Sequence, residues 1–241
     1  MSLVPYVHVD VSLAEGEPGD AIELTEAETR HLRRVLRLPD DAEVEVADGA
    51  GNEAGARLGA RELVLTTEAV YRTAAQPSLW VAQALPKGRK LDDVIRQVTE
   101  LGVDGIMVIA AKHSVTRLDE VKIPRARQRW EGVARAASEQ ARRPWRPRIV
   151  GPRGPSDLVG EPGTLLLAHP GGAPLPEVIV DHVQAERITV AIGPEGGWSD
   201  DEVARFEEAG AILAGLGSTV LRTEHAAAAA LAVTAAGVGR W

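Results

Sequence analysis

The stretch ITVAIGPEGGWSDDEV (188–203) decides the fold class of this 241-residue chain. Its first five residues are mostly apolar and β-branched, which predicts a buried strand over 188–192. A glycine-rich turn (193–197) follows at once. A helix is predicted directly after the turn, because Ser199 and Glu202, three residues apart, match a capping box. A strand that passes through glycines into a helix is the repeating unit of α/β proteins.

A second unit of the same kind follows in LGSTVLRTEHAAAAALAV (216–233). A strand predicted over 211–216 ends in glycine, and an alanine-rich helix begins near Thr223. Two such strand ends expose backbone N–H and C=O groups at the carboxyl edge of a sheet, where α/β proteins bind ligands. GPEGG alone is equally compatible with a tight turn that binds nothing. The two turns together, with LRTE (221–224) at a helix start, favour a ligand site.

The segment from residue 79 onward alternates between strand and helix patterns. Further strands are predicted over 79–84, 105–111 and 164–168. Helices are predicted over 91–101, ending at Gly102, and over 124–142, before Pro144. This alternation predicts an α/β domain over 75–241, with a mainly parallel sheet and helices on both faces.

The first 74 residues have a different pattern. Strand-like segments cover 6–9, 43–47 and 62–69, and the helical pattern HLRRVLRL covers 31–38. Asp48-Gly49 is a hairpin turn that we expect to join the last two strands. The sequence therefore predicts a small β-rich domain over 1–74, followed by a linker over 74–78.

Composition excludes several classes of protein. The chain has no cysteine, so it has neither disulfides nor thiolate zinc sites, and its six histidines show no HxH or HExxH spacing. We therefore predict no metal site. GxxxxGK[ST] is absent and Gly49-Ala50-Gly51 precedes no helix, which disfavours P-loop and Rossmann nucleotide enzymes. Without a signal peptide or an apolar stretch long enough for a bilayer, a cytoplasmic location is expected.

Charge is distributed unevenly along the chain. The net charge is −8, yet residues 76–155 hold 16 basic and 8 acidic residues. Within 117–153, eleven basic residues stand against four acidic ones and are interleaved with Trp130 and Trp145. Such a band can neutralise phosphates while an aromatic ring stacks on a base. The alternative is that these arginines only solvate a helix face.

Six segments, in this order and spacing, resemble the bacterial 16S ribosomal RNA (uracil-N3)-methyltransferases of the SPOUT superfamily. They are HLRRVLRL (31–38), QALPKGRKLDDVIRQVTELGVDGI (83–106), RAASEQARR (135–143), LLLAHP (165–170), IGPEGGWSDDEV (192–203) and LGSTVLRTEHAAAAAL (216–231). The resemblance implies a PUA-like RNA-binding barrel, a SPOUT domain with a C-terminal trefoil knot, and a homodimer. It implies transfer of a methyl group from S-adenosylmethionine to N3 of uridine 1498 in the small-subunit RNA.

The resemblance also implies which residues act. The donor would be held by three loops, through Ala168, His169, Gly171, Ile192, Gly193, Glu195, Gly196, Gly197, Leu216, Gly217, Val220, Leu221 and Arg222. The RNA would be held by His31, Arg33, Arg34, Arg37, Lys87, Arg129, Arg135, Arg142 and Arg143. His169 has the alternative role of a hydrogen-bonded histidine at a strand end, and Lys87 that of an ordinary loop lysine.

The chain departs from the family pattern at a few positions. The family usually has an arginine just before LRTE, where this chain has Ser218 and Thr219. It usually has threonine at His225 and an arginine near His113. These departures concern substrate contacts more than the fold.

Uridine N3 carries a proton at neutral pH, so the site must favour the deprotonated base. Either a carboxylate takes the proton or an arginine stabilises the developing anion. Candidate carboxylates are Glu139, Glu195 and Glu224, and candidate arginines are Arg142 and Arg222. We favour Arg222. Glu224 is the second catalytic candidate, and it could instead only stabilise the start of its helix.

Two other functions remain open at this stage. One is a non-catalytic RNA-binding module, which would have no need of GPEGG together with LGSTVLRTE. The other is a SPOUT enzyme with a different acceptor, such as a transfer-RNA 2′-hydroxyl.

Overall fold

The computed structural model describes residues 4–116 and 118–241 and divides into two compact units. The first unit contains the chain up to Ala74 together with Ser138–Arg146, and the second contains the remainder. One unit boundary falls between Ala74 and Ala75. The sequence did not indicate that Ser138–Arg146, in the middle of the chain, packs with the N-terminal residues.

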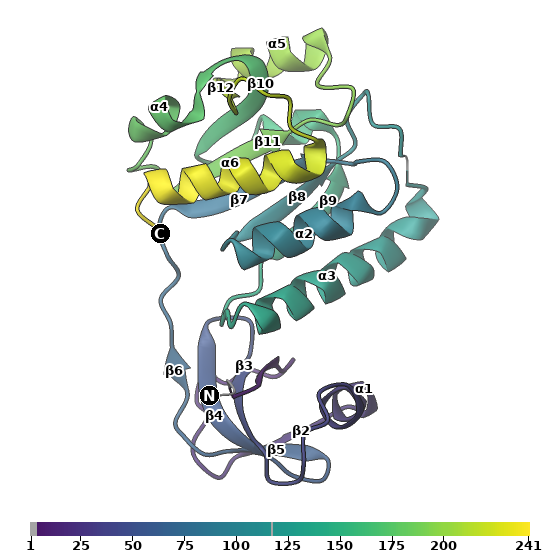
Figure 1. The fold of residues 1–241 in the computed structure, drawn as a ribbon, viewed down its shortest axis with the longest axis vertical. Helices are drawn as coiled ribbons and strands as arrows, with labels where there is room; N and C mark the ends of the chain where they lie inside the picture. Colours follow the sequence, from purple (N-terminus) through teal and green to yellow (C-terminus); the bar gives the residue numbers. More distant parts are fainter. Residues whose placement is uncertain (1–3, 117) are drawn as a thin grey trace. The chain divides into compact units, whose positions relative to one another are not determined.

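The first unit is built on a six-stranded sheet (Figure 1). The strand order is β1-β3-β4-β5-β2, with β6 paired to β4, and only the β1–β3 pair is parallel. The strands are β1 (Tyr6–His8), β2 (Ala21–Glu23), β3 (Glu43–Ala47), β4 (Asn52–Leu58), β5 (Glu62–Leu65) and β6 (Val70–Tyr71). Alternate side chains of β2, β3, β4 and β5, together with Val7 of β1, contribute to the apolar core of this unit, whereas both residues of β6 are exposed.

The predicted hairpin has a different partner strand. The turn after β3 leads into β4, which pairs with β3 from Glu43↔Arg57 to Ala47↔Glu53. The expectation that 43–47 pairs with 62–69 across this turn was wrong. Strand β4 reads NEAGARL, and its small and polar residues have low strand propensity. Pairing with strands on both sides compensates for that weak local preference.

The basic helical pattern of the first unit begins earlier than predicted. Helix α1 (Glu26–Arg30) starts at Thr25, which forms a capping box with Glu28, and continues as the π-helix η1 (His31–Val35). Leu32 is buried, whereas Arg34 and Arg37 are exposed.

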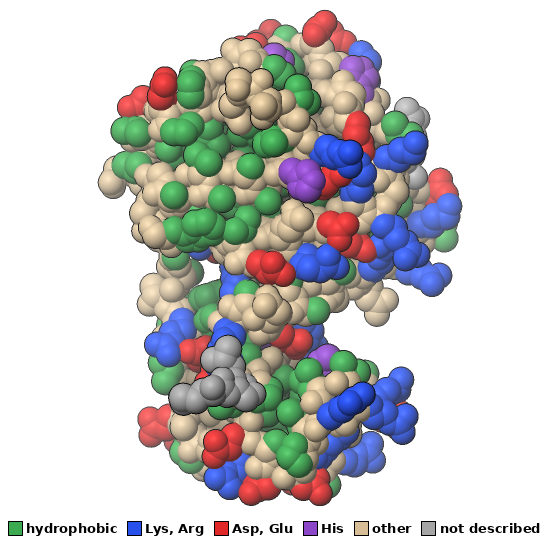
Figure 2. All heavy atoms as spheres, in the orientation of Figure 1, with side chains coloured by type: hydrophobic (Ala, Val, Ile, Leu, Met, Phe, Trp, Pro, Cys, Tyr) green, Lys and Arg blue, Asp and Glu red, His purple; other side chains and the backbone are tan. Residues whose placement is uncertain are grey.

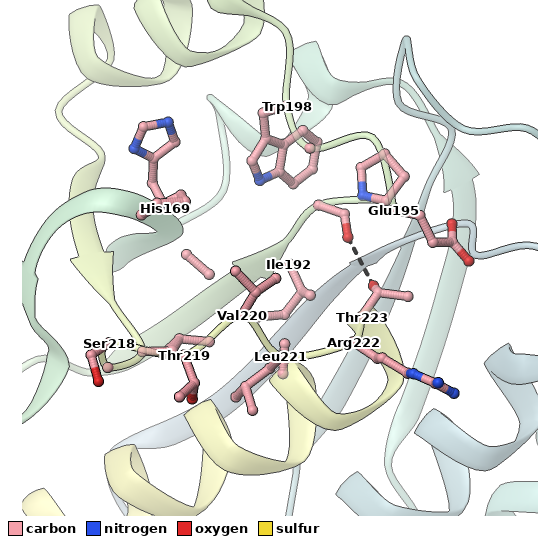
Figure 3. Close-up of a pocket in the computed structure, with 18 of the residues that line it drawn as sticks. His169, Ile192, Glu195, Trp198, Ser218, Thr219, Val220, Leu221, Arg222 and Thr223 are labelled. Carbon is pink, nitrogen blue, oxygen red and sulfur yellow. Dashed lines mark hydrogen bonds between the residues drawn. The ribbon is translucent and has the colours of Figure 1, made fainter.

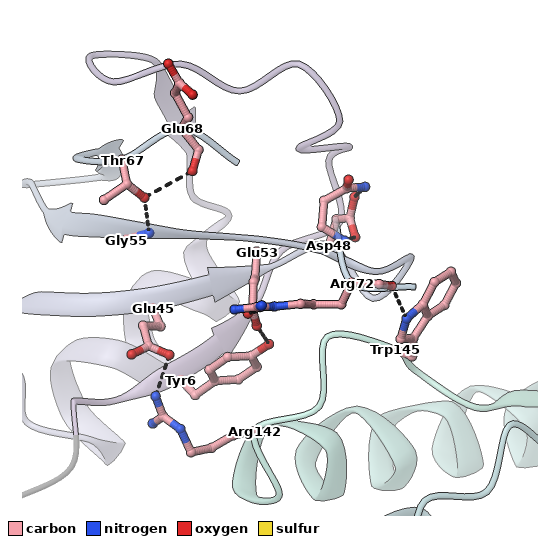
Figure 4. Close-up of polar contacts among 11 residues, drawn as sticks. Tyr6, Glu45, Asp48, Glu53, Gly55, Thr67, Glu68, Arg72, Arg142 and Trp145 are labelled. Carbon is pink, nitrogen blue, oxygen red and sulfur yellow. Dashed lines mark hydrogen bonds and ion pairs between the residues drawn. The ribbon is translucent and has the colours of Figure 1, made fainter. Parts of the chain in front are cut away.

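The Ser138–Arg146 segment is tied to the first unit by Arg142 (Figure 4). Its guanidinium donates to the Val4 carbonyl at 2.6 Å, pairs with Glu45 and lies 5.1 Å from the centre of the Tyr6 ring. The Tyr6 hydroxyl donates to Glu53 at 2.9 Å. Burial and this carboxylate partner together raise the pKa of Tyr6 far above its usual value.

The second unit contains a six-stranded sheet in which every pair is parallel, in the order β12-β10-β11-β7-β8-β9. This confirms the α/β class and the mainly parallel sheet. The strands are β7 (Ser78–Ala84), β8 (Gly105–Ile109), β9 (Arg148–Arg153), β10 (Thr164–Pro174), β11 (Arg187–Ile192) and β12 (Ile212–Gly215). The helices are α2 (Lys90–Glu100), α3 (Ile123–Gln140), α4 (Leu175–Val180), α5 (Asp200–Glu208) and α6 (Thr223–Gly237), with short 3₁₀ turns η2 (Glu120–Lys122) and η3 (Pro155–Leu158). Strand β9 and helix α4 were not predicted.

Both faces of the parallel sheet are covered. One face packs against apolar side chains of α2, α3, α4 and α6. The opposite face packs against η3, against Trp198 in the loop before α5, and against Phe206 on α5. Figure 1 shows α6, in yellow, crossing the sheet beside α2. No helix within residues 4–116 and 118–241 is long and apolar enough to cross a membrane.

Candidate functional site

A cavity of about 880 Å³ opens at the carboxyl ends of β10, β11 and β12 (Figure 3). Three segments build most of it: 168–170, 192–198 and 216–223. The first protrudes because the pairing of β10 with β12 shifts register between Ala168 and Ala173. The volume falls within the range of small-molecule sites. The two glycine-rich strand ends, together with the LLLAHP segment, therefore form one site.

Most of the predicted donor-binding residues line this cavity. Eleven of the thirteen do so, whereas Gly171 and Gly196 lie just outside the lining. The lining residues that were not predicted as donor contacts are Lys90, Pro170, Pro194, Trp198, Ser218, Thr219, Thr223 and Ala226. Trp198 could have been suggested by its place directly after GPEGG. Lys90 could not, because it lies on α2 and about a hundred residues separate it from the turn.

The floor of the cavity is held by Thr223 at the start of α6. Its hydroxyl donates to the Gly193 carbonyl at 2.8 Å and accepts from Nε2 of Gln83 at 2.9 Å. Thr223 and Gln83 are both buried. These bonds connect the ends of β7 and β11 to the first residue of α6, so the cavity rests on regular secondary structure.

The GPEGG turn is held from two sides. The Glu195 carboxylate accepts from the backbone N–H of Lys87 at 3.1 Å and from Nζ of Lys90 at 3.5 Å. On the other side, Nδ1 of His113 lies 3.2 Å from the carbonyl oxygens of Gly196 and Gly197. His113, one of the departures from the family pattern, thus contacts the turn directly.

Lys90 also pairs with Glu224, with its Nζ 3.2 Å from Oε2. The pKa of Glu224 lies below its usual value, chiefly because its own backbone N–H donates to the carboxylate and secondly because of Lys90. Burial alone would raise the pKa of Glu195, but hydrogen bonds from its own backbone N–H, from Lys87 and from Lys90 lower it overall. Both groups are therefore held as carboxylates, and a lowered pKa makes each a weaker proton acceptor.

Arg222 lies at the edge of the cavity and differs from these groups. Its side chain is exposed and makes no hydrogen bond or ion pair with any described residue. The guanidinium charge is therefore available to a ligand. The other two candidates, Glu139 and Arg142, do not line the cavity; both belong to the first unit, where Glu139 accepts from the backbone N–H of His8.

His169 lies across the cavity from Trp198 in Figure 3. Its Nδ1 accepts from the backbone N–H of Gly171 at 3.1 Å, which closes a local turn. That bond requires a lone pair on Nδ1, so the proton of the neutral ring is on Nε2. This hydrogen bond agrees with the alternative role of His169, that of a hydrogen-bonded histidine at a strand end.

The predicted RNA-binding residues fall into two groups. His31, Arg34, Arg37 and the Lys87 side chain are exposed and have no internal ion-pair partner among the described residues. By contrast, Arg33 donates to two backbone carbonyls and pairs with Asp40, and Arg129 pairs with Asp92. Arg142 donates to the Val4 carbonyl and pairs with Glu45 within the first unit. Arg135 and Arg143 also have interaction partners.

Two family models match the chain. Residues 74–235 match the RNA methyltransferase domain, and residues 24–67 match the RNA methyltransferase PUA domain. The fold, the cavity and these matches define the class: the chain is an RNA methyltransferase with an N-terminal PUA domain.

The individual relatives narrow this class further. The chain is 32% identical over 226 residues to ribosomal RNA small subunit methyltransferase E of Mycobacterium bovis, covering 88% of this chain and 84% of the relative. It is 27% identical to the protein of the same name from Bacillus subtilis, covering 90% and 91%. The chain belongs to the ribosomal RNA small subunit methyltransferase E family.

Solved structures agree with this fold. A Legionella pneumophila protein described as a methyltransferase, in complex with the bound cofactor SAM, has a TM-score of 0.86 and 27% identity and covers 98% of both chains. Ribosomal RNA small subunit methyltransferase E from Neisseria gonorrhoeae, bound to S-adenosylmethionine, has a TM-score of 0.86 and 24% identity over 97% of this chain and 98% of that one.

Proposed function

We propose that the chain transfers a methyl group from S-adenosylmethionine to N3 of a specific uridine, uridine 1498, in the 16S RNA of the small ribosomal subunit. The observation that carries the proposal is the convergence of three loops from the carboxyl ends of parallel strands on one cavity. Relatives of the same family carry the small ribosomal subunit in their names, and the Legionella structure holds SAM.

The residues around the cavity suit this donor. Leu216, Val220 and Leu221 provide apolar surface for an adenine ring, and Val220 is 98% exposed, so a ligand that covers it gains apolar burial. Gly193 and Gly217 let backbone groups approach a ligand closely. When bound, S-adenosylmethionine supplies an electrophilic methyl group on a sulfonium.

The chain's own residues then prepare the acceptor. Removing the proton from uridine N3 leaves negative charge on the base, and the guanidinium of Arg222, which has no partner among the described residues, can stabilise that charge. Glu224 is the weaker candidate, because its lowered pKa and its pairing with Lys90 favour a positioning role. We assign no general base.

In this proposal, RNA is held by Lys and Arg side chains that form no ion pair with other described residues. Arg34 and Arg37 flank the exposed Val35 and Leu36 in the first unit, and Lys87 follows β7 in the second. Figure 2 shows Lys and Arg side chains gathered over the region of α1 in the first unit. Charge and exposed apolar surface together suit phosphates and unstacked bases.

We further propose that the enzyme acts in the cytoplasm as a homodimer. The outward side of α6 carries small residues and the exposed Val233, and Val180 on α4 is 64% exposed. Figure 2 shows hydrophobic side chains across the α4 and α6 region of the second unit. Small residues permit close packing of a second helix.

The test incubates the purified protein with labelled S-adenosylmethionine and small ribosomal subunits from cells that lack the endogenous activity. Modified nucleosides are then identified by mass spectrometry. Label in 3-methyluridine of the 16S RNA supports the proposal. Label in another nucleoside or in transfer RNA overturns the acceptor, and donor binding without any transfer favours an RNA-binding module.

A further inference from the structure

Trp198 contains a polar group that no described residue satisfies. The residue is 8% exposed, and its indole Nε1 is buried without a hydrogen-bond partner. A buried donor without an acceptor costs free energy, so native proteins keep few of them and usually for a reason. Among the described residues with such an orphaned atom, Trp198 alone also lines the cavity.

The surroundings of the ring determine where this N–H points. The ring packs edge-on against Phe206, with centroids 5.3 Å apart and an interplanar angle of 81°. The ring also lies against Gly193, where an added Cβ would come within 3.2 Å of Nε1. In Figure 3 the indole nitrogen faces the space bounded by His169, Ile192 and Val220.

We infer that the Trp198 indole N–H is a donor-binding group, which hydrogen-bonds an oxygen atom of bound S-adenosylmethionine. This inference rests on the proposed function. An indole donates and does not accept, so its partner must carry a lone pair. The oxygen atoms of S-adenosylmethionine belong to the ribose and to the carboxylate, and either can accept this bond.

Two ligands distinguish these oxygens. S-adenosylhomocysteine has both the ribose and the carboxylate, whereas 5′-methylthioadenosine has the ribose alone. Trp198→Phe removes the N–H and keeps an aromatic ring against Phe206. The matched control is Trp130→Phe, a buried tryptophan on α3 that does not line the cavity.

Calorimetry on the full chain measures both affinities. We expect Trp198→Phe to bind S-adenosylhomocysteine about fivefold more weakly or worse, while the control binds as the wild type does. A similar loss for 5′-methylthioadenosine places the acceptor on the nucleoside, which contains the ribose, and a loss confined to S-adenosylhomocysteine identifies the carboxylate. Unchanged affinity for both ligands overturns the inference and leaves the proposed function intact. If the wild type binds neither ligand, the proposed function fails and the inference fails with it.

A second measurement observes ligand binding on the wild type and uses the variant only to assign one signal. The chain has five tryptophans, so a ¹H–¹⁵N spectrum of the wild type contains at most five indole N–H signals. We expect one of them, absent from the Trp198→Phe spectrum, to move downfield when S-adenosylhomocysteine is added. An indole spectrum that does not change at saturating ligand contradicts the proposed hydrogen bond.

Discussion

At the scale of single residues, the site contains charged groups that are paired and one that is not. Lys90 pairs with both Glu195 and Glu224, so one cation offsets one of two carboxylate charges and the three side chains keep a net charge of −1. Arg222, at the edge of the same cavity, has no described partner. A guanidinium is always protonated, so it can stabilise an anion at any physiological pH.

We therefore predict that Arg222→Ala lowers the single-turnover rate of methyl transfer about a hundredfold, which is the usual cost of losing one anion-stabilising donor. The rate is measured with saturating S-adenosylmethionine and small subunits. Arg222→Lys keeps the charge and should recover part of the rate. Turnover equal to that of the wild type, with S-adenosylhomocysteine binding intact, would contradict the role assigned to Arg222.

At the scale of elements, the turn between β3 and β4 depends on one carboxylate. Asp48 accepts from the backbone N–H groups of Leu13, Ala50 and Asn52 and from the Asn52 side chain. Burial alone would raise the pKa of Asp48, but these hydrogen bonds lower it overall. The carboxylate therefore stabilises the first unit at pH values above the unfolded pKa of about 4.

The hydrogen bonds of Asp48 predict how the free energy of unfolding of this protein depends on pH. The stabilisation from Asp48 is complete at neutral pH and is lost as the pH falls through its lowered folded-state pKa. Asp48→Asn should be less stable than the wild type at pH 7, and the gap should narrow below about pH 4. Urea unfolding followed across pH measures both effects. A gap that is constant from pH 7 to pH 2 would falsify the electrostatic account.

At the scale of the whole molecule, net charge is a poor guide to function. The chain carries −8, but many acidic and basic groups pair with each other, as Arg57 does with Asp41 and Glu43. RNA affinity depends on the cations left over. Each phosphate that a cation neutralises steepens the dependence of binding on salt.

Replacement of Arg34 and Arg37 together by glutamine should weaken binding to small-subunit RNA and reduce the slope of log K against log salt by about two. Arg57→Gln is the matched control, since its charge is already paired within the same unit. Filter binding over a range of salt concentrations gives the slopes. Equal slopes for the double variant and the wild type would remove this surface from the RNA interface.

Some features of the protein follow from the sequence because they depend on neighbouring residues. The parallel strands at 79–84, 105–111 and 188–192 were predicted from apolar patterns, and the capping box of Ser199 with Glu202 was predicted from their spacing. The convergence of the glycine turns also follows, because parallel strands bring their carboxyl ends to one edge. The trefoil knot remains a prediction from the family resemblance.

Other features were decided only by the tertiary structure. Lys90 meets Glu195 and Glu224 across 105 and 134 residues of chain, a separation on which local pattern carries no information. The same reason explains why Ser138–Arg146 was not expected in the first unit. Strand β4 was missed for a local reason: it follows β3 closely in the chain, but its small and polar residues have low strand propensity. The orphaned N–H of Trp198 depends on every group packed around the ring. A single sequence records which side chains a protein has, whereas only folding decides which of them are satisfied from within and which remain available to a ligand.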